Sequence, residues 1–141
     1  MGKKLKSEGE YLNGKKNGLW KIYNDDGDLN CEEEYLNDEE NGKYKDYYQN
    51  GILKIEGEHL NPEMNGTWKG YYSNGNLRFE IDYMNNEGYG KSYTINGKLE
   101  FEGKYKYYDK WDGKGYDENG NIIYELINGN GKVKEFDWKV L

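Results

Sequence analysis

The stretch TWKGYYSNGNLRFE, residues 67–80, has the features of a β-hairpin. An Asn-Gly dipeptide at 74–75 separates two segments rich in aromatic and branched residues, and this dipeptide is the strongest local signal for a two-residue type I′ turn. Lys69 precedes the turn and Glu80 follows it at the same distance, so the two charges face each other across the hairpin. The stretch therefore predicts two antiparallel strands in a defined register.

The same pattern occurs five times along the chain. The turn dipeptides begin at residues 26, 50, 74, 96 and 119, so the steps between them are 24, 24, 22 and 23 residues. In each copy a lysine and a glutamate are equidistant from the turn, and such opposite charges favour the correct register by about 0.2–1 kcal/mol per pair. The predicted structural cross-strand pairs are Lys21–Glu32, Lys45–Glu56, Lys69–Glu80, Lys91–Glu102 and Lys114–Glu125.

Five hairpins in series, with a half-hairpin at each end, predict an all-β protein. We expect a single elongated, twisted antiparallel sheet of about 12 strands, as in other repeat arrays. One array covers residues 1–141. Six-residue connections such as Leu12–Asn17 and Leu36–Asn41 join its first hairpins, and connections of four and seven residues, Met84–Glu87 and Lys106–Asp112, join the later ones. The expected units are a half-repeat at 1–17, hairpins at about 18–41, 42–65, 66–87, 88–112 and 113–130, and a half-repeat at 131–141 with a strand near Gly131–Asp137.

Alternation along the strands divides the side chains between two faces. Leu77, Phe79 and Trp68 are expected on an apolar face, and the lysine–glutamate pairs on a charged face. A tyrosine follows each of these lysines by two residues, and a row of exposed aromatic rings is typical of a partner-binding surface. Alternatively, these rings only pack over the aliphatic stems of Lys54 and Arg78. The partner-binding candidates are Tyr23, Tyr47, Tyr71, Tyr93 and Tyr116.

Composition narrows the classes of function. The net charge of −7 repels nucleic-acid phosphates and anionic lipid headgroups and favours a basic protein partner, so we expect no nucleic-acid binding and disfavour membrane-lipid binding. One cysteine excludes an intramolecular disulfide, and no apolar run approaches the roughly 20 residues of a membrane helix. The N-terminus has no signal-peptide core, which predicts a cytoplasmic protein, or a secreted one if a signal has been removed.

The residues best suited to chemistry have structural positions in the repeat. His59, the only histidine, occupies a column otherwise held by tyrosines, and Cys31, the only cysteine, occupies an apolar column. The stretch GYGKS at 88–92 resembles the end of a phosphate-binding loop, but a strand follows where that loop needs a helix. The recurring glutamates face lysines instead of an apolar cleft, which argues against a glycosidase. We therefore expect a non-enzymatic protein with no catalytic residue, no metal site and no cofactor.

Several short motifs resemble a known repeat family. The stretches EGEY at 8–11, FEGKY at 101–105 and GYG at 88–90 are similar to MORN repeats, which combine aromatic-Glu-Gly-x-aromatic with Gly-x-Gly. The Asn-Gly-x-Leu element after an aromatic strand resembles the bacterial MORN variant, and the likeness extends from about residue 5 to 137. This resemblance implies an extended single-layer sheet and a non-catalytic role as a protein-interaction or assembly scaffold.

Other functions stay open at this point. The resemblance also implies an alternative role, because some bacterial relatives carry an antitoxin label: an acidic antitoxin or immunity protein that neutralises a basic toxin. Lipid binding has been proposed for some MORN arrays. The stretches NGLW at 17–20 and NGTWKGYY at 65–72 resemble cell-wall-binding repeats, which adds a glycan-binding module as an alternative. The expected partner is thus a protein or a second copy of the chain joined through the terminal edges, with a glycan as the alternative.

Overall fold

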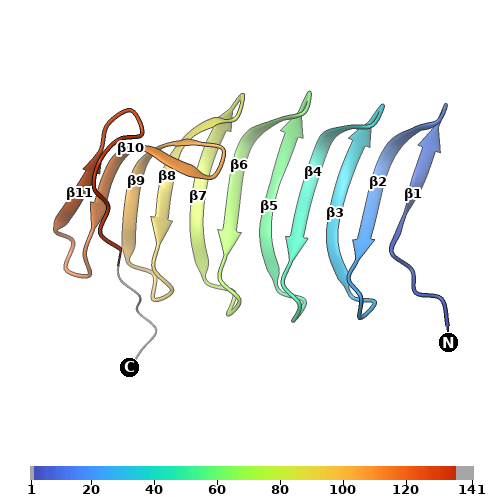
Figure 1. Ribbon diagram of the computed structural model, residues 1–141, viewed down its shortest axis with the longest axis horizontal. Coiled ribbons are helices and arrows are strands. Elements are labelled where there is room, and N and C mark those ends of the chain that lie inside the picture. Colours follow the sequence, from blue (N-terminus) through green and yellow to red (C-terminus); the bar gives the residue numbers. More distant parts are fainter. Residues whose placement is uncertain (1, 136–141) are drawn as a thin grey trace.

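The computed structural model describes residues 2–135 and contains one antiparallel sheet whose strands follow each other in sequence order (Figure 1). Each strand pairs only with its sequence neighbours, so the chain is an all-β array of hairpins, as predicted. No helix in the described part is long and apolar enough to cross a membrane. The eleven strands are β1 Ser7–Leu12, β2 Lys15–Tyr23, β3 Leu29–Leu36, β4 Glu39–Tyr47, β5 Leu53–Leu60, β6 Glu63–Tyr71, β7 Leu77–Met84, β8 Glu87–Tyr93, β9 Leu99–Lys106, β10 Asp109–Tyr116 and β11 Ile122–Leu126.

The prediction of a twelfth strand near the C-terminus is wrong for the residues that the structure describes. Residues 131–135 form no strand, and the remaining part of the expected Gly131–Asp137 strand lies outside the described residues. Two glycines with positive φ, Gly129 at 77° and Gly131 at 154°, turn the chain away from β11. The segment then brings a Glu135 carboxylate oxygen to 3.2 Å from the Lys110 ammonium of β10.

A row of alternating charges, the charge row, crosses the whole sheet with one side chain from each strand. The structure places the members of all five predicted pairs directly opposite each other, and each lysine also faces the glutamate of the preceding strand. Within the described residues, only Lys69 and Glu80 also form a close ion pair in this row, with nitrogen and oxygen 3.5 Å apart. From β1 to β11 the row is Glu8, Lys21, Glu32, Lys45, Glu56, Lys69, Glu80, Lys91, Glu102, Lys114 and Glu125.

The predicted type I′ turns are wrong at the five Asn-Gly or Asp-Gly sites. After β2, the Gly27 N–H donates to the Asn24 carbonyl and the Asn24 N–H donates to the Asp28 carbonyl, which closes a three-residue loop. Gly27 alone has a positive φ, 87°, as expected where a type I turn ends in a left-handed glycine. The other four loops repeat this pattern at Gly51, Gly75, Gly97 and Gly120.

The tight two-residue turns lie at the opposite ends of the strands, where we expected longer connections. Asn13 and Gly14 have φ values of 51° and 79°, and Asn85 and Asn86 have values of 52° and 68°. Positive φ at both central residues is the mark of a type I′ turn. The strands are therefore longer than predicted, because they include most of the expected connections.

Bulges explain both the register and the unequal repeat lengths. Tyr71 pairs with Leu77 and Gly70 with Phe79, so Arg78 is one extra residue that offsets the three-residue loop. Leu77 thus lies opposite Tyr71 on the charged face, a correction to its predicted place on the apolar face. Bulges also occur where one hairpin pairs with the next. Such a bulge has two extra residues in the repeats of 24 residues and one in the repeat of 23, and the repeat of 22 has none.

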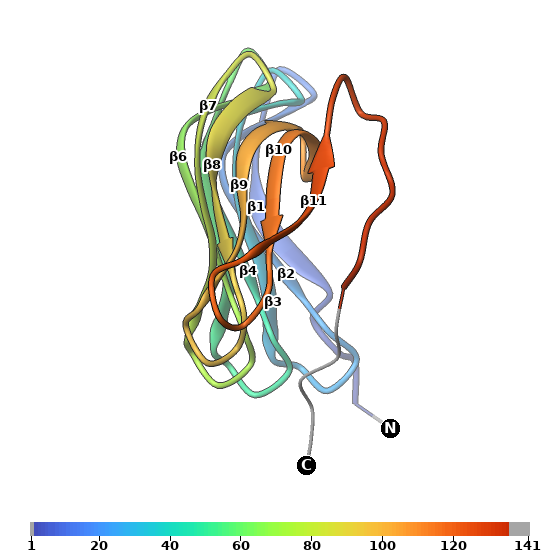
Figure 2. The same cartoon turned by 90° about the vertical axis from the view of Figure 1, so that its left-hand side faces the viewer.

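The core lies on the face opposite the charge row, which we call the aromatic face. Trp68, Ile81 and Phe101 are its most deeply buried residues. The tip of the β9–β10 hairpin folds over this face (Figure 1). There the Tyr108 ring lies edge-on to Trp68, at 6.3 Å between centroids. Figure 2 shows that the sheet is curled, with β6–β8 and β11 on opposite sides of the view. The later strands therefore cover much of their own aromatic face.

Candidate functional site: an acidic aromatic hollow

The predicted partner-binding tyrosines divide into two groups. The hydroxyls of Tyr23, Tyr47 and Tyr71 donate to carboxylates of the charge row, at 2.6, 2.7 and 2.7 Å. Burial and the accepting carboxylate raise the pKa of Tyr47 and of Tyr71 to about 12. Tyr93 and Tyr116 make no such bond within residues 2–135, and all five rings are half-buried. The first three tyrosines are therefore held by the sheet itself, which favours a structural role for them.

The alternative prediction, that these tyrosines pack over Lys54 and Arg78, is wrong, because both cations contact other tyrosines. The Lys54 ammonium lies 5.6 Å from the ring centroid of Tyr48, and the Arg78 guanidinium lies 5.4 Å from that of Tyr72. Each cation thus covers the tyrosine one residue after the predicted one. Arg78 is the extra residue of a bulge, and it turns to the side of Phe79.

The aromatic face is hollowed beside the tip of the β9–β10 hairpin. We call this feature, with a volume of about 430 Å³, the acidic hollow. No lysine or arginine lines it among the described residues. Its lining includes three carboxylates and four aromatic rings: Glu33, Glu40, Glu63, Tyr44, His59, Tyr107 and Tyr108.

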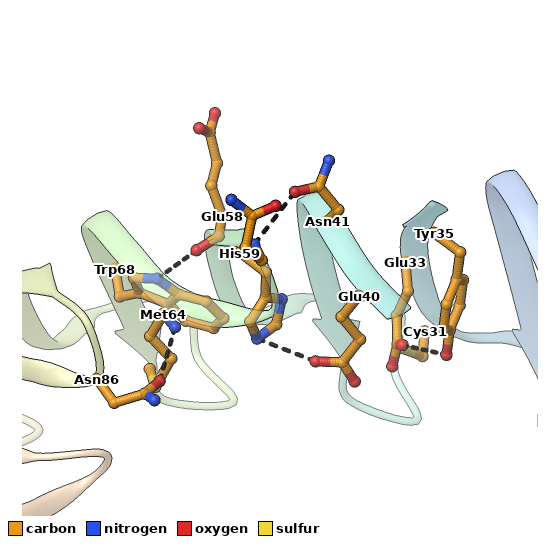
Figure 3. A network of polar contacts seen from close by, with 11 residues as sticks. Cys31, Glu33, Tyr35, Glu40, Asn41, Glu58, His59, Met64, Trp68 and Asn86 are labelled. Carbon is orange, nitrogen blue, oxygen red and sulfur yellow. Dashed lines mark hydrogen bonds and ion pairs between the residues drawn. The ribbon is translucent and has the colours of Figure 1, made fainter. Parts of the chain in front are cut away.

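Strand alternation brings Glu33 to the aromatic face. It lies on β3 between Cys31 and Tyr35, whose side chains point the same way. The Tyr35 hydroxyl donates to one Glu33 oxygen at 2.6 Å, and the Cys31 thiol donates to the other at 3.3 Å (Figure 3). Neither donor carries a positive charge, so the Glu33 carboxylate is held in place without being neutralised.

Glu40 is the second fixed carboxylate of the acidic hollow. It pairs with Tyr35 across β3 and β4, and its Oε2 lies 3.2 Å from His59 Nε2 (Figure 3). Burial raises the pKa of Glu40, and the nearby Glu33 carboxylate raises it further. Burial lowers the pKa of His59, which favours the neutral form of the ring beside Glu40. The hollow therefore concentrates negative charge in a half-buried setting.

Aromatic packing holds the rings of the acidic hollow in place. The Trp68 indole N–H donates to the Glu58 carbonyl at 3.0 Å (Figure 3). Its ring centroid lies 5.0 Å from that of His59 and 5.6 Å from that of Tyr44. Ring faces attract cations because of their quadrupole. A lysine of the chain makes this contact on the same face, where the Lys16 ammonium lies 5.0 Å from the Tyr35 ring centroid.

Sequence reasoning missed the acidic hollow because it sorted the glutamates by the charge row alone. Glu33 occupies the column filled by Gly57, Ile81 and Gly103 in the later odd-numbered strands. A carboxylate in a column of small and apolar residues is a signal that could have revealed it. His59 has the predicted character of a packed, partly buried ring, and Cys31 is buried in the predicted apolar column.

The ordered stack of hairpins defines a tandem-repeat β protein. The family model of the MORN repeat variant matches residues 16–37, 40–61 and 64–85, which contain the β2–β3, β4–β5 and β6–β7 hairpins. The chain is a MORN-repeat protein, and such repeats are generally associated with binding to proteins or membranes. No curated protein matches the chain. The β8–β9 and β10–β11 hairpins continue the sheet beyond the matched repeats with shorter steps.

Proposed function

We propose that this protein is a non-enzymatic interaction module whose protein partner inserts a lysine or arginine side chain into the acidic hollow. The observation that carries this proposal is the combination of three carboxylates with four aromatic rings and no described lysine or arginine in the lining. Such a lining offers a cation both ion pairs and ring faces. A cation–ring contact contributes about 0.5–2 kcal/mol, more as water is excluded.

The electrostatics of Glu40 support the same partner chemistry. Because burial and Glu33 raise the pKa of Glu40, ionisation of Glu40 in the free protein is less favourable than in water. A bound ammonium or guanidinium group would remove that penalty, since an opposite charge nearby favours the ionised form. The net charge of −7 would also accelerate the encounter with a basic protein.

Two versions of this function fit the proposal. In one, the array is a scaffold that holds a basic partner protein. In the other, it is an immunity protein that neutralises a basic toxin. Both place the cationic side chain in the acidic hollow and differ only in what the partner does elsewhere. The same negative charge opposes binding to anionic lipid.

Titration with a basic peptide tests the proposal. An arginine-serine repeat peptide should shift the NMR signals of the His59 ring and the Trp68 indole N–H, and a glutamate-serine repeat peptide should not. Glu40→Gln should weaken binding by about tenfold through the loss of one charged partner. Glu118→Gln, in an exposed loop, changes the net charge by the same amount as Glu40→Gln and should leave binding unchanged. Added salt should weaken the binding of the basic peptide to the wild-type protein. Equal binding by both variants, or binding that salt does not affect, would contradict the proposal.

A further inference from the structure

The outer edge of β1 is an unpaired strand edge in the described structure (Figure 1). All six β1 residues are exposed, and Leu5, just before the strand, is 55% exposed. We propose that two copies of the chain pair along this edge as antiparallel strands, with the two-fold axis at Ser7. The pairing joins the two sheets into one, and it does not depend on the function proposed for the acidic hollow.

Backbone geometry limits how two β1 edges can meet. The Lys6 carbonyl accepts a hydrogen bond from the Tyr23 N–H at 2.8 Å, so the backbone of Lys6 faces β2. Backbone groups alternate along a strand, so those of Leu5, Ser7 and Gly9 face outward. A two-fold pairing of these outward groups that is centred on the charged stretch therefore has its axis at Lys6, at Ser7, at Glu8 or at Gly9.

Charge selects one of these four registers. With the axis at Lys6, two Lys6 ammonium groups face each other. With the axis at Ser7, Lys6 faces Glu8 of the second copy and Lys4 faces Glu10, and symmetry repeats both pairs. With the axis at Glu8, two Glu8 carboxylates face each other. With the axis at Gly9, Glu8 faces Glu10 twice. Directly opposed like charges destabilise a strand pair, so only the register with its axis at Ser7 combines charges of opposite sign throughout.

The central Lys6–Glu8 pairs matter most for this selection. The Lys4 ammonium already donates to the Asp25 carbonyl at 2.9 Å, which competes with its contact to the second copy. The Lys6 ammonium makes no hydrogen bond or ion pair within residues 2–135. A Lys6–Glu8 contact between copies continues the alternation of the charge row across the new interface.

Side-chain size agrees with the same register. With the axis at Ser7, Leu5 faces Gly9 of the second copy on the aromatic face. Inside the sheet, Phe79 faces Gly70 in the same large-to-small relation. The Trp20 ring covers Gly9 closely, since a Cβ there would lie 2.3 Å from it. Leu5 would therefore leave solvent and pack beside the Trp20 ring of the second copy.

The charge pattern favours a second copy over an unrelated strand. The stretch KLKSEGE, residues 4–10, places two lysines and two glutamates symmetrically about Ser7. Read antiparallel to itself, the stretch is its own electrostatic complement. The opposite edge strand, IIYEL at 122–126, contains a single charge and has no such symmetry.

Sedimentation velocity over a range of protein concentrations tests the pairing. The wild-type mass should rise from 16.6 kDa towards twice that value. Lys6→Glu should raise the dimer dissociation constant by at least about tenfold, because both central pairs become like-charged. The double variant Lys6→Glu/Glu8→Lys should restore dimerisation, since it only exchanges the two charges. Lys132→Glu, with the same change in net charge on an exposed residue, should behave like wild type.

A cross-link tests the register. Ser7→Cys places two thiols across the axis with Cα atoms about 5.5 Å apart, within the range of a disulfide, so oxidation should give a covalent dimer. The Glu10→Cys thiol faces Lys4 of the second copy and should give no covalent dimer under the same conditions. A monomer at every concentration, equal weakening by Lys6→Glu and Lys132→Glu, no recovery in the double variant, or cross-linking at residue 10 in place of residue 7 would each overturn the proposal.

Discussion

Replacing Gly57 with alanine tests whether close ring packing stabilises the sheet. A Cβ at Gly57 would lie 2.0 Å from the Trp68 ring, whereas carbon atoms in contact are about 3.5–4.0 Å apart. The Trp68 side chain is fully buried and its indole N–H is bonded to the Glu58 carbonyl. The ring cannot move aside without disturbing that bond and its contacts with Tyr44 and His59.

The expected loss of stability follows from these contacts. Overpacking a core costs about 1–3 kcal/mol, and a weakened indole hydrogen bond adds about 0.5–1.5 kcal/mol. Alanine restricts the unfolded chain and returns about 0.4–1 kcal/mol. We therefore expect Gly57→Ala to lower the free energy of unfolding by about 2 kcal/mol.

Gly9→Ala is the matched control for this substitution. A Cβ at Gly9 would lie 2.3 Å from the Trp20 ring, but Trp20 packs against Tyr11, which is 63% exposed at the sheet edge. The Trp20 indole N–H is also bonded, to the Glu10 carbonyl, but its ring neighbour at the sheet edge is exposed and can move with it, so the loss should be smaller, below about 1 kcal/mol. Urea unfolding followed by circular dichroism measures both values. A neutral or stabilised Gly57→Ala, or a larger loss for Gly9→Ala, would refute the packing argument.

Three further predictions concern single side chains. Tyr47→Phe removes the hydroxyl that donates to Glu32 and should lower the urea midpoint by the equivalent of about 1 kcal/mol, whereas Tyr93→Phe should leave it unchanged. Because the pKa of Glu40 is raised in the folded state, its ionised form opposes folding, so Glu40→Gln should raise the melting temperature at neutral pH. The higher melting temperature of Glu40→Gln should disappear as the pH falls below 4.5, the usual pKa of a glutamate, and a difference that persists in acid would contradict this explanation. Burial raises the pKa of the Cys31 thiol to about 12, so a thiol reagent should react with it only after unfolding, and fast reaction with the native protein would disprove this.

The strand register could be predicted from the sequence, but the turn type could not. The charge pattern and the spacing of aromatic residues both indicate which residues of neighbouring strands face each other. A three-residue loop followed by a one-residue bulge has the same length as a two-residue loop in a regular hairpin. Lys69 and Glu80 are therefore equidistant from the turn in either case, and the pattern does not distinguish the two.

The acidic hollow depends on a contact that does not repeat along the chain. One of its walls is Tyr108, which reaches Trp68 only because the sheet curls and the β9–β10 tip bends over it. Tyr107 and Tyr108 occupy the turn that holds Asn13 and Gly14 in the first hairpin. Two tyrosines in such a turn indicate that the tip packs against another surface, but the sequence does not specify which one.

The residues of the charge row alternate in sign from each strand to the next, and this alternation restricts how many strands can be added or removed. Duplicating the coding sequence of one strand would place two like charges next to each other and weaken the sheet at that point. Duplicating a whole hairpin would preserve the order of signs. We therefore expect the length of such molecules to change in evolution by even numbers of strands, so that a carboxylate remains at both rims.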